Sequence, residues 1–169
     1  LAHETVIDAL KAYTESGRYT DVCFIRGNNG QVVFSIQKDA DFGTIVSDGV
    51  SPLTRVWKAA KAGEVVVSDL ANHAAAGNRP VQFVGAPIKE GDEILGVVVL
   101  RISRAAVEQI MSVRAGLGNS GESYLVGPDF LMRSDSYLDI TDGAGASQKP
   151  SHTVDASFAK GITCMTDAT

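Results

Sequence analysis

The amino-acid sequence predicts an α+β fold, in which a long N-terminal helix precedes a five-stranded antiparallel sheet with the other helices on one side. Three observations support this prediction. Two apolar runs are joined by the turn sequence Gly27-Asn28-Asn29-Gly30, a helix with a clear N-cap follows them, and three further strand-like runs come after that helix. The start of a second sheet then follows the last of these strands.

The N-terminal helix is expected over residues 2–17. Its apolar residues, which include Leu10 and Tyr13, are spaced so that they mark one face, and polar residues occupy the other face. Gly17 ends the helix, because glycine is common just after a helix C-terminus. This amphipathic helix is therefore a candidate for a spine or a dimer interface.

Two strands form the expected hairpin, one at residues 21–26 and one at residues 31–37. In the second strand Val32, Phe34 and Ile36 alternate with polar residues, which is typical of a strand with one buried face. The glycine-containing turn between the two strands completes the hairpin.

Ser51 and Pro52 mark the start of the next helix, because serine is a favoured N-cap and proline is favoured at the first helical position. The helix is expected to run through Trp57 to Gly63. Three strands follow, at residues 64–68, 81–88 and 94–102, and the polar residues 89–93 are expected to form the turn between the last two.

The last third of the chain begins with a helix that Ser103 caps and that is expected over residues 104–114. Two short strands, at residues 123–126 and 130–134, are expected to form a hairpin. One hairpin has too few strands to close a core alone, so this second sheet is incomplete. Further elements are expected as follows: a loop at residues 139–150 and a short helix at residues 153–160.

Gly116, Gly118 and Gly121 match the GxGxxG pattern of dinucleotide-binding loops. Such a loop must follow a strand and open a helix, so that the pyrophosphate meets the helix N-terminus. Here the order is reversed, since a helix precedes the glycines and a strand follows them. We therefore interpret this segment as a helix C-terminus whose glycines adopt positive φ before a hairpin.

The composition argues against several classes of function. A net charge of -5 at pH 7, a pI near 5.1 and the lack of a lysine or arginine cluster argue against nucleic-acid binding and a polybasic membrane surface. No apolar run is long enough to span a membrane. Both ends are expected to be cuts from a longer protein, because residue 1 enters a helix without a cap and the final GITCMTDAT closes no element.

No sequence motif indicates catalysis or a metal site. The histidines lack the spacing of catalytic motifs, and the two cysteines lie far apart without zinc-ligand spacing. Asp69 and His73 could ligate a metal if their loop were helical, but a polar loop is favoured. We therefore expect no enzyme activity, no metal and no cofactor, and we interpret Cys23 as a small core residue.

Four segments carry a family resemblance: DVCFIRGNNGQVVFSIQKDADFGTIV at residues 21–46, RPVQFVGAPI at 79–88, ILGVVVLRIS at 94–103 and IMSVRAGLGNSGESYLVGPDFLMRSDS at 110–136. Together they resemble the Cache family of extracytoplasmic sensor domains, whose PAS-like folds occur in bacterial chemoreceptors, sensor histidine kinases and membrane-bound cyclases. The last segment is the most specific, and the resemblance covers roughly residues 1–160.

The resemblance implies the organisation of a double-Cache receptor. Residues 1–17 would be a spine helix, 18–103 the PAS-like ligand-sensing lobe, 104–117 a connecting helix, and 118–169 the start of a second, membrane-proximal-type lobe. Such a domain senses a small molecule for a chemotaxis or two-component receptor, and the ligand shifts the arrangement of helices in a homodimer formed through the N-terminal helix. Flanking segments would anchor it in the inner membrane with this part in the periplasm.

One alternative is a cytoplasmic PAS- or GAF-like module that holds a cofactor or acts only as a dimerisation interface. Transmembrane segments on both sides of the chain would exclude this alternative. A purified protein that absorbs light through a bound cofactor would support it.

The resemblance also suggests site residues. Many relatives that bind amino acids place an Arg-x-Trp motif on the helix after the hairpin and an aspartate on the final strand. Arg55 and Trp57 match the motif, but Arg101 stands where the aspartate would fall. An arginine there would repel a ligand ammonium and favour a carboxylate or another anion. Arg55 and Trp57 have an equally good structural interpretation, with the tryptophan in the core and the arginine in solvent.

Other candidates come from polar positions near strand ends. The loop that leaves the second strand carries several of them, and binding residues are often mounted on such loops, although a solvated turn is the simpler interpretation. Arg133 and Asp135 are instead expected to share a strand face and to fix the junction between the lobes. The candidate ligand-binding residues are Phe34, Lys38, Asp41, Phe42, Arg55, Trp57, Asp69, Gln82, Val84 and Arg101.

Overall fold

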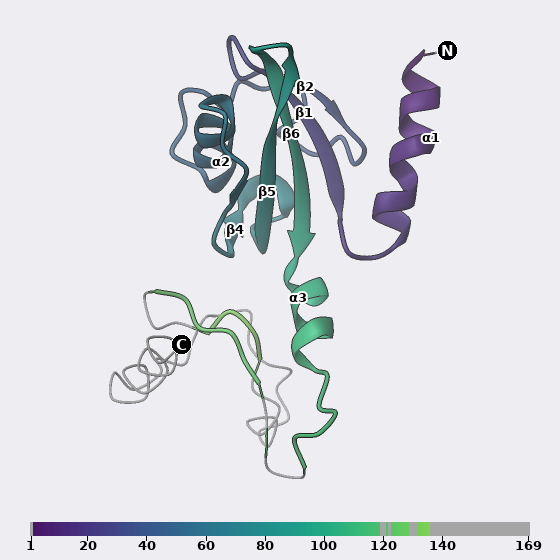
Figure 1. The fold of residues 1–169 in the computed structure, drawn as a ribbon, viewed down its shortest axis with the longest axis vertical. Coiled ribbons are helices and arrows are strands. Elements are labelled where there is room, and N and C mark those ends of the chain that lie inside the picture. The colour runs from purple at the N-terminus through teal and green to yellow at the C-terminus, as the bar shows by residue number, and fades with distance from the viewer. Residues whose placement is uncertain (1, 119–120, 122, 129–131, 136–169) are drawn as a thin grey trace. The chain divides into compact units, whose positions relative to one another are not determined.

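The computed structural model of the chain describes residues 2–118, 121, 123–128 and 132–135 (Figure 1). By its internal contacts the chain divides into two compact units, Leu1–Ala106 and Val107–Thr169. The division falls within the helix that the sequence predicts as a connector. Each unit is described by itself below.

The first unit begins with helix α1, Ala2–Glu15. Gly17 follows with a φ of 73°, so the predicted glycine stop is confirmed. The ring of Tyr13, near the end of the helix, lies 6.4 Å from the ring of Tyr19, which leads into the first strand. In the described part of the chain, no helix is long and apolar enough to cross a membrane.

The first unit contains an antiparallel sheet, which confirms the predicted fold class. The order of its strands is β2-β1-β6-β5-β3, and the short β4 also pairs with β5. β1 and β6, the first and last strands of this sheet along the chain, are neighbours near its centre (Figure 1). The six strands of the described residues are β1 Asp21–Arg26, β2 Val32–Ser35, β3 Val66–Val67, β4 Ala71–His73, β5 Arg79–Glu90 and β6 Glu93–Ser103.

Two details of the sheet correct the sequence prediction. His73 was expected in a loop, but it belongs to β4, which pairs with β5 and is the sixth strand. The turn expected over residues 89–93 is shorter, because β5 continues to Glu90 and β6 begins at Glu93. Gly91 makes this tight turn possible with a φ of 59°.

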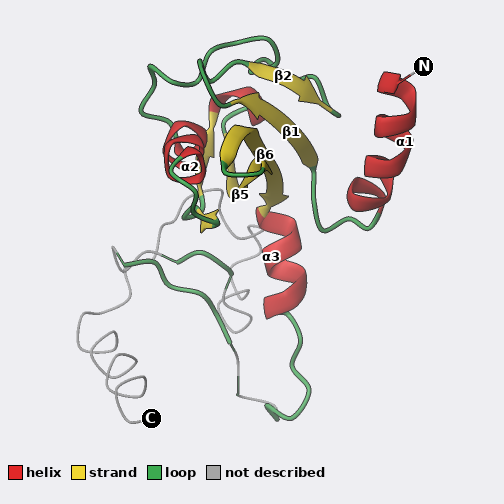
Figure 2. Ribbon diagram, turned by 45° about the horizontal axis from the view of Figure 1, so that its top comes forward, coloured by secondary structure: helices red, strands yellow, loops and turns green. Residues whose placement is uncertain are grey.

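Helix α2, Pro52–Lys61, covers one face of the sheet (Figure 2). It starts as predicted, since the Ser51 hydroxyl accepts a hydrogen bond from the Thr54 amide at 3.1 Å and proline occupies the first turn. The helix packs closely on β5 at Gly85, where an added Cβ would overlap Val56 Cγ1. The buried core residues between helix and sheet include Val56, Trp57, Phe83 and Val97.

Helix α3, Arg104–Met111, begins in the first unit and ends in the second. The Ser103 hydroxyl caps its N-terminus as predicted, by accepting a hydrogen bond from the Ala106 amide. Gly116 and Gly118 follow it with φ values of 83° and 66°, which supports the helix C-terminus over the nucleotide loop. A bridge between Val126 and Met132 is consistent with the predicted hairpin. The predicted loop at 139–150 and helix at 153–160 lie outside the described residues.

Candidate ligand-binding site

A hollow of about 350 Å³ opens on the α2 side of the first unit. This volume is at the lower end of the range for small-molecule sites, which is roughly 300 to 1,000 Å³. Three segments of the chain line the hollow: the loop after β2, the start of α2, and the end of β4 with the turn after it. Its lining residues are Ala40, Asp41, Thr44, Ile45, Val46, Gly49, Ser51, Leu53, Thr54, His73, Ala74 and Ala75.

The loop after β2 is shaped by local hydrogen bonds. The Thr44 hydroxyl donates to the Asp41 carbonyl at 2.7 Å, and Gly43 between them adopts a φ of 81°. The Thr54 hydroxyl then donates to the Val46 carbonyl at 2.8 Å and ties the loop to the start of α2. These bonds fix the loop and connect it to the start of α2.

Asp21, at the start of β1, fixes the beginning of the same loop by hydrogen bonds. Its side chain is fully buried, and its Oδ1 accepts the amides of Val22, Ile36 and Gln37 at 2.8, 2.9 and 3.1 Å. Its Oδ2 accepts the Ser35 hydroxyl at 2.8 Å. A buried carboxylate with several donors is well satisfied, so Asp21 has a structural role in fixing the end of β2.

Asp41 and His73 form a buried pair at the base of the hollow. His73 Nε2 lies 3.1 Å from Asp41 Oδ2, and the two side chains are 7% and 10% exposed. The His73 ring also packs edge-on against Phe83, with ring centroids 5.0 Å apart. The pair is thus fixed by a polar contact on one side and an aromatic contact on the other.

The charge on Asp41 is stabilised by its neighbours. Burial raises the pKa of this carboxyl, but the hydrogen bond and charge of His73, together with the charge of Arg101, lower it by more. The net pKa lies below the ordinary value of 3.8. Asp41 is therefore ionised at neutral pH.

Arg101 lies on β6 behind this pair and is also buried. Its Nη1 is 2.7 Å from Asp39 Oδ2, an ion pair without the angular alignment of a hydrogen bond, and its Nε donates to the Thr20 hydroxyl at 3.1 Å. Arg101 does not line the hollow. Asp39 thus supplies a counter-charge for Arg101 within the chain, and the expected anionic ligand at Arg101 stays a prediction.

Of the ten predicted site residues, Asp41 lines the hollow and Arg101 lies just behind it. Lys38 and Phe42 belong to the same loop but are exposed, and neither is among the lining residues. Lys38 adopts a φ of 52°, which marks the sharp turn by which the chain leaves β2. One side chain of this predicted loop, that of Asp41, thus lines the hollow.

Trp57 and Arg55, the two residues of the Arg-x-Trp motif, lie where the structural interpretation expects them, in the core and in solvent respectively. Trp57 is 4% exposed and packs in the core, where its indole Nε1 donates to the Arg26 carbonyl at 3.0 Å. Arg55, two residues away on α2, points to solvent. The structure therefore does not bring the two side chains together over the hollow.

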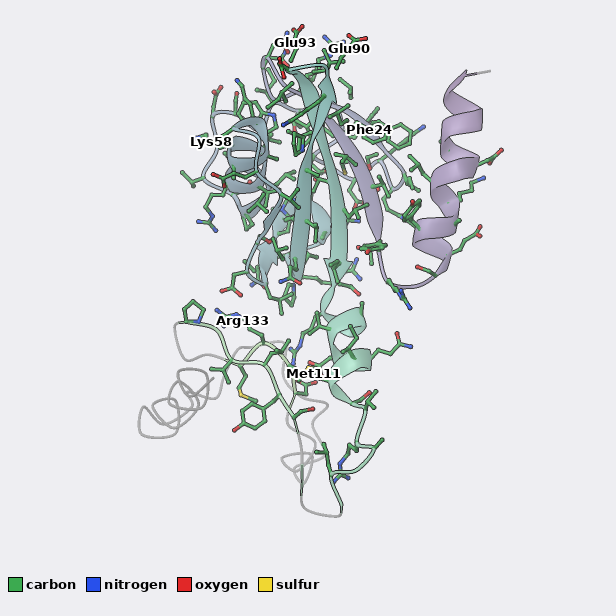
Figure 3. All side chains as sticks on the ribbon, in the orientation of Figure 1. Phe24, Lys58, Glu90, Glu93, Met111 and Arg133 are labelled. Atoms are coloured by element: carbon green, nitrogen blue, oxygen red, sulfur yellow. The ribbon has the colours of Figure 1, made fainter. Side chains whose placement is uncertain are left out.

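The remaining candidates lie away from the hollow. Phe34 stacks on Phe24 with ring centroids 5.1 Å apart, on the face of the sheet opposite α2, and Figure 3 shows Phe24 on that side. Gln82 and Val84 of β5 share this opposite face, because they alternate with the core residue Phe83. Asp69 is exposed.

His73 is the main residue that the sequence interpretation missed. It was weighed only as a partner of Asp69 for a metal, whereas the structure pairs it with Asp41. In the described part of the chain, no group of three or more His, Cys, Asp or Glu side chains could hold a metal ion. The position of His73 depends on the pairing of β4 with β5, and three residues without alternation give no local signal for that pairing.

The antiparallel sheet with α2 on one face is the architecture of a PAS-like fold, and solved structures match it. The chain resembles the sensory domain of the Campylobacter jejuni chemoreceptor Tlp3, with 16% identity and a TM-score of 0.60 over 92% of this chain and 58% of that one. It also resembles the ligand-binding domain of the Pseudomonas fluorescens chemoreceptor CtaA in complex with L-valine, with 17% identity and a TM-score of 0.54 over 73% and 52% of the two chains.

A third match is the sensor domain of the Vibrio cholerae histidine kinase DctB, with 18% identity and a TM-score of 0.53 over 66% of this chain and 42% of that one. No protein-family model and no curated protein matches the sequence. The chain spans about half the length of these solved domains. At this level of identity the matches show the fold, and they confirm the Cache-type sensor fold that the sequence predicted.

Proposed function

We propose that this chain is a small-molecule-sensing domain from the extracytoplasmic part of a bacterial transmembrane receptor of the chemotaxis or two-component type. The observation that carries the proposal is the hollow beside α2, which has a buried Asp41–His73 pair at its base. Concave, mostly apolar sites with a few placed polar groups are typical of ligand pockets. The matched structures support it, since they are sensor or ligand-binding domains, one of them with a bound amino acid.

The proposed mechanism is differential binding and not catalysis. The open hollow is lined by segments from three parts of the chain, so a ligand that contacts all three favours a closed arrangement of the loop after β2, α2 and β4. Helix α1 would pass this change on as the interface of a homodimer. Its Ile7 and Leu10 are only partly buried and Tyr13 is 50% exposed, so an apolar stripe is left for a partner helix.

A thermal-shift and calorimetric screen of the whole chain tests the proposal, with amino acids, amines and carboxylates as probes. A ligand that binds only the folded state raises the melting temperature. Ala75→Leu would fill the hollow, because Ala75 lines it on the turn after β4. Ala62→Leu is the matched control, since Ala62 is exposed after α2 and outside the hollow.

We expect at least one probe to stabilise the natural chain and the Ala62→Leu variant, but not Ala75→Leu. If no probe changes the melting temperature, or if Ala75→Leu responds like the control, the hollow is not a ligand site and the proposal fails. Analytical ultracentrifugation of the same samples would show whether the chain dimerises.

A further inference from the structure

The polar end of the sheet face under α2 carries an excess of negative charge. Asp21, Asp39 and Asp41 supply three carboxylates there, and Arg101 supplies one permanent positive charge. Arg101 is matched by Asp39, and the donors described above satisfy Asp21. Asp41 is therefore left with His73 as its side-chain hydrogen-bond partner.

One oxygen of Asp41 still lacks a donor. Its Oδ1 is buried and has no hydrogen-bond partner among the described residues, although the side chain lines the hollow. Leaving a charged acceptor buried without a donor is costly, more so than for a neutral group. The terminal torsion of an aspartate is broad, so a modest rotation would turn Oδ1 towards a donor that enters the hollow.

The hollow provides little for a ligand carboxylate. The described residues that line it include no lysine or arginine. The start of α2 is also closed to anions, because Pro52 has no amide hydrogen and the Thr54 amide is bound by Ser51. The Arg55 amide donates to the Ser51 carbonyl, which leaves at most the Leu53 amide in the first turn.

From this arrangement we infer that the hollow takes a small primary amine with an apolar body and without a carboxylate. This inference rests on the proposed function of the same hollow. The ammonium group supplies donors to Asp41 and balances its charge. The alkyl body packs on Ile45, Val46 and Leu53. An amino acid would bring a second, negative group for which the hollow has no cation.

Three matched compounds test the inference by calorimetry at neutral pH. L-valine carries both groups, isobutylamine is valine without its carboxylate, and isovalerate has a similar branched body with a carboxylate and no amine. Isobutylamine should bind more tightly than valine, and isovalerate should bind most weakly. Asp41→Asn should weaken isobutylamine by at least about tenfold, because it removes a charge-assisted hydrogen bond.

Asp48→Asn controls for net charge, since Asp48 is an exposed carboxylate of the same loop that does not line the hollow. It should bind isobutylamine like the natural chain, and circular dichroism should show both variants folded.

Valine or isovalerate binding more tightly than isobutylamine, or Asp41→Asn leaving amine binding unchanged, would overturn the inference while the proposed ligand site stands. The same holds if other compounds of the wider screen bind in the hollow and isobutylamine does not. If none of the three compounds and no other probe binds there, the proposed function itself fails together with the inference.

Discussion

The two ends of the sheet face under α2 are built in opposite ways. At one end Trp57 fills the space between helix and sheet, with its indole donating to Arg26 at the end of β1. At the other end the side chains of Asp41 and His73 meet beneath an open hollow. The same strands pass through both regions, since β1 runs from Asp21 to Arg26.

If the hollow is the ligand site proposed above, this difference separates the residues that stabilise the fold from the residues that bind. At the filled end Gly85 lets α2 approach β5 closely, and the Trp57 side chain is buried in the core. At the hollow end polar groups replace apolar packing, so that stability there depends on hydrogen bonds to a few carboxylates. Sites that bind are often the places where the rules for a well-packed core are broken.

Replacing Trp57 by alanine removes the side chain that fills one end of the face under α2. Of the changes considered, it should lower the free energy of unfolding the most. We expect a loss of about 4 kcal/mol in the free energy of unfolding, because a large buried side chain leaves a cavity and the Arg26 carbonyl loses its donor. Urea unfolding followed by far-UV circular dichroism measures the change.

Arg55→Ala on the same helix is the control for this substitution. Because Arg55 points to solvent, its loss should change stability by no more than about 0.5 kcal/mol. Equal effects of the two substitutions would show that Trp57 is not the core residue described here.

Most of the sheet could be predicted from the sequence because its signals are local. Alternating apolar residues mark β2, and the Ser51-Pro52 pair marks the start of α2. The strand β4 gives no such signal, because it exists only through its pairing with β5. His73 therefore remained hidden, although the loop that carries Asp41 could be predicted.

The rest of the site depends on which way side chains face in the folded protein. The spacing of residues along α2 does not reveal whether Trp57 is a core residue or a pocket residue. The packing of α2 on the sheet determines that Trp57 belongs to the core. The sequence also placed Arg101 at a ligand, but could not reveal that Asp39 pairs with it. Long-range ion pairs of this kind have no periodic pattern along a chain.

Asp21→Ala would remove the hydrogen bonds that fix the end of β2 beside the hollow, and it should lower the free energy of unfolding by an intermediate amount. We expect a loss of about 3 kcal/mol, because the buried Ser35 hydroxyl would lose its acceptor, the Gln37 amide would lose the carboxylate, and the Ile36 amide would keep only the Val22 carbonyl at 3.3 Å. Trp57 fluorescence during urea unfolding measures it.

Hydrogen exchange would locate the effect of this substitution. Exchange at the amides of Ile36 and Gln37 should accelerate more than exchange at core amides of β6. Asp21→Asn keeps one acceptor oxygen and should lose less stability than Asp21→Ala. An unchanged exchange rate at both amides would contradict the anchoring role of Asp21.

The pH dependence of the Asp41–His73 pair should give the smallest of the three effects. Because the folded pKa of Asp41 lies below its ordinary value of 3.8, the ionised carboxyl contributes stability that is complete well above pH 3.8. This contribution is lost as the pH falls through 3.8 and then through the lower folded pKa. The free energy of unfolding of the natural chain, minus that of Asp41→Asn, should therefore shrink over this interval, whereas the difference from Asp48→Asn should change less. A difference from Asp41→Asn that stays constant with pH would mean that the pair at the hollow contributes no charge-dependent stability.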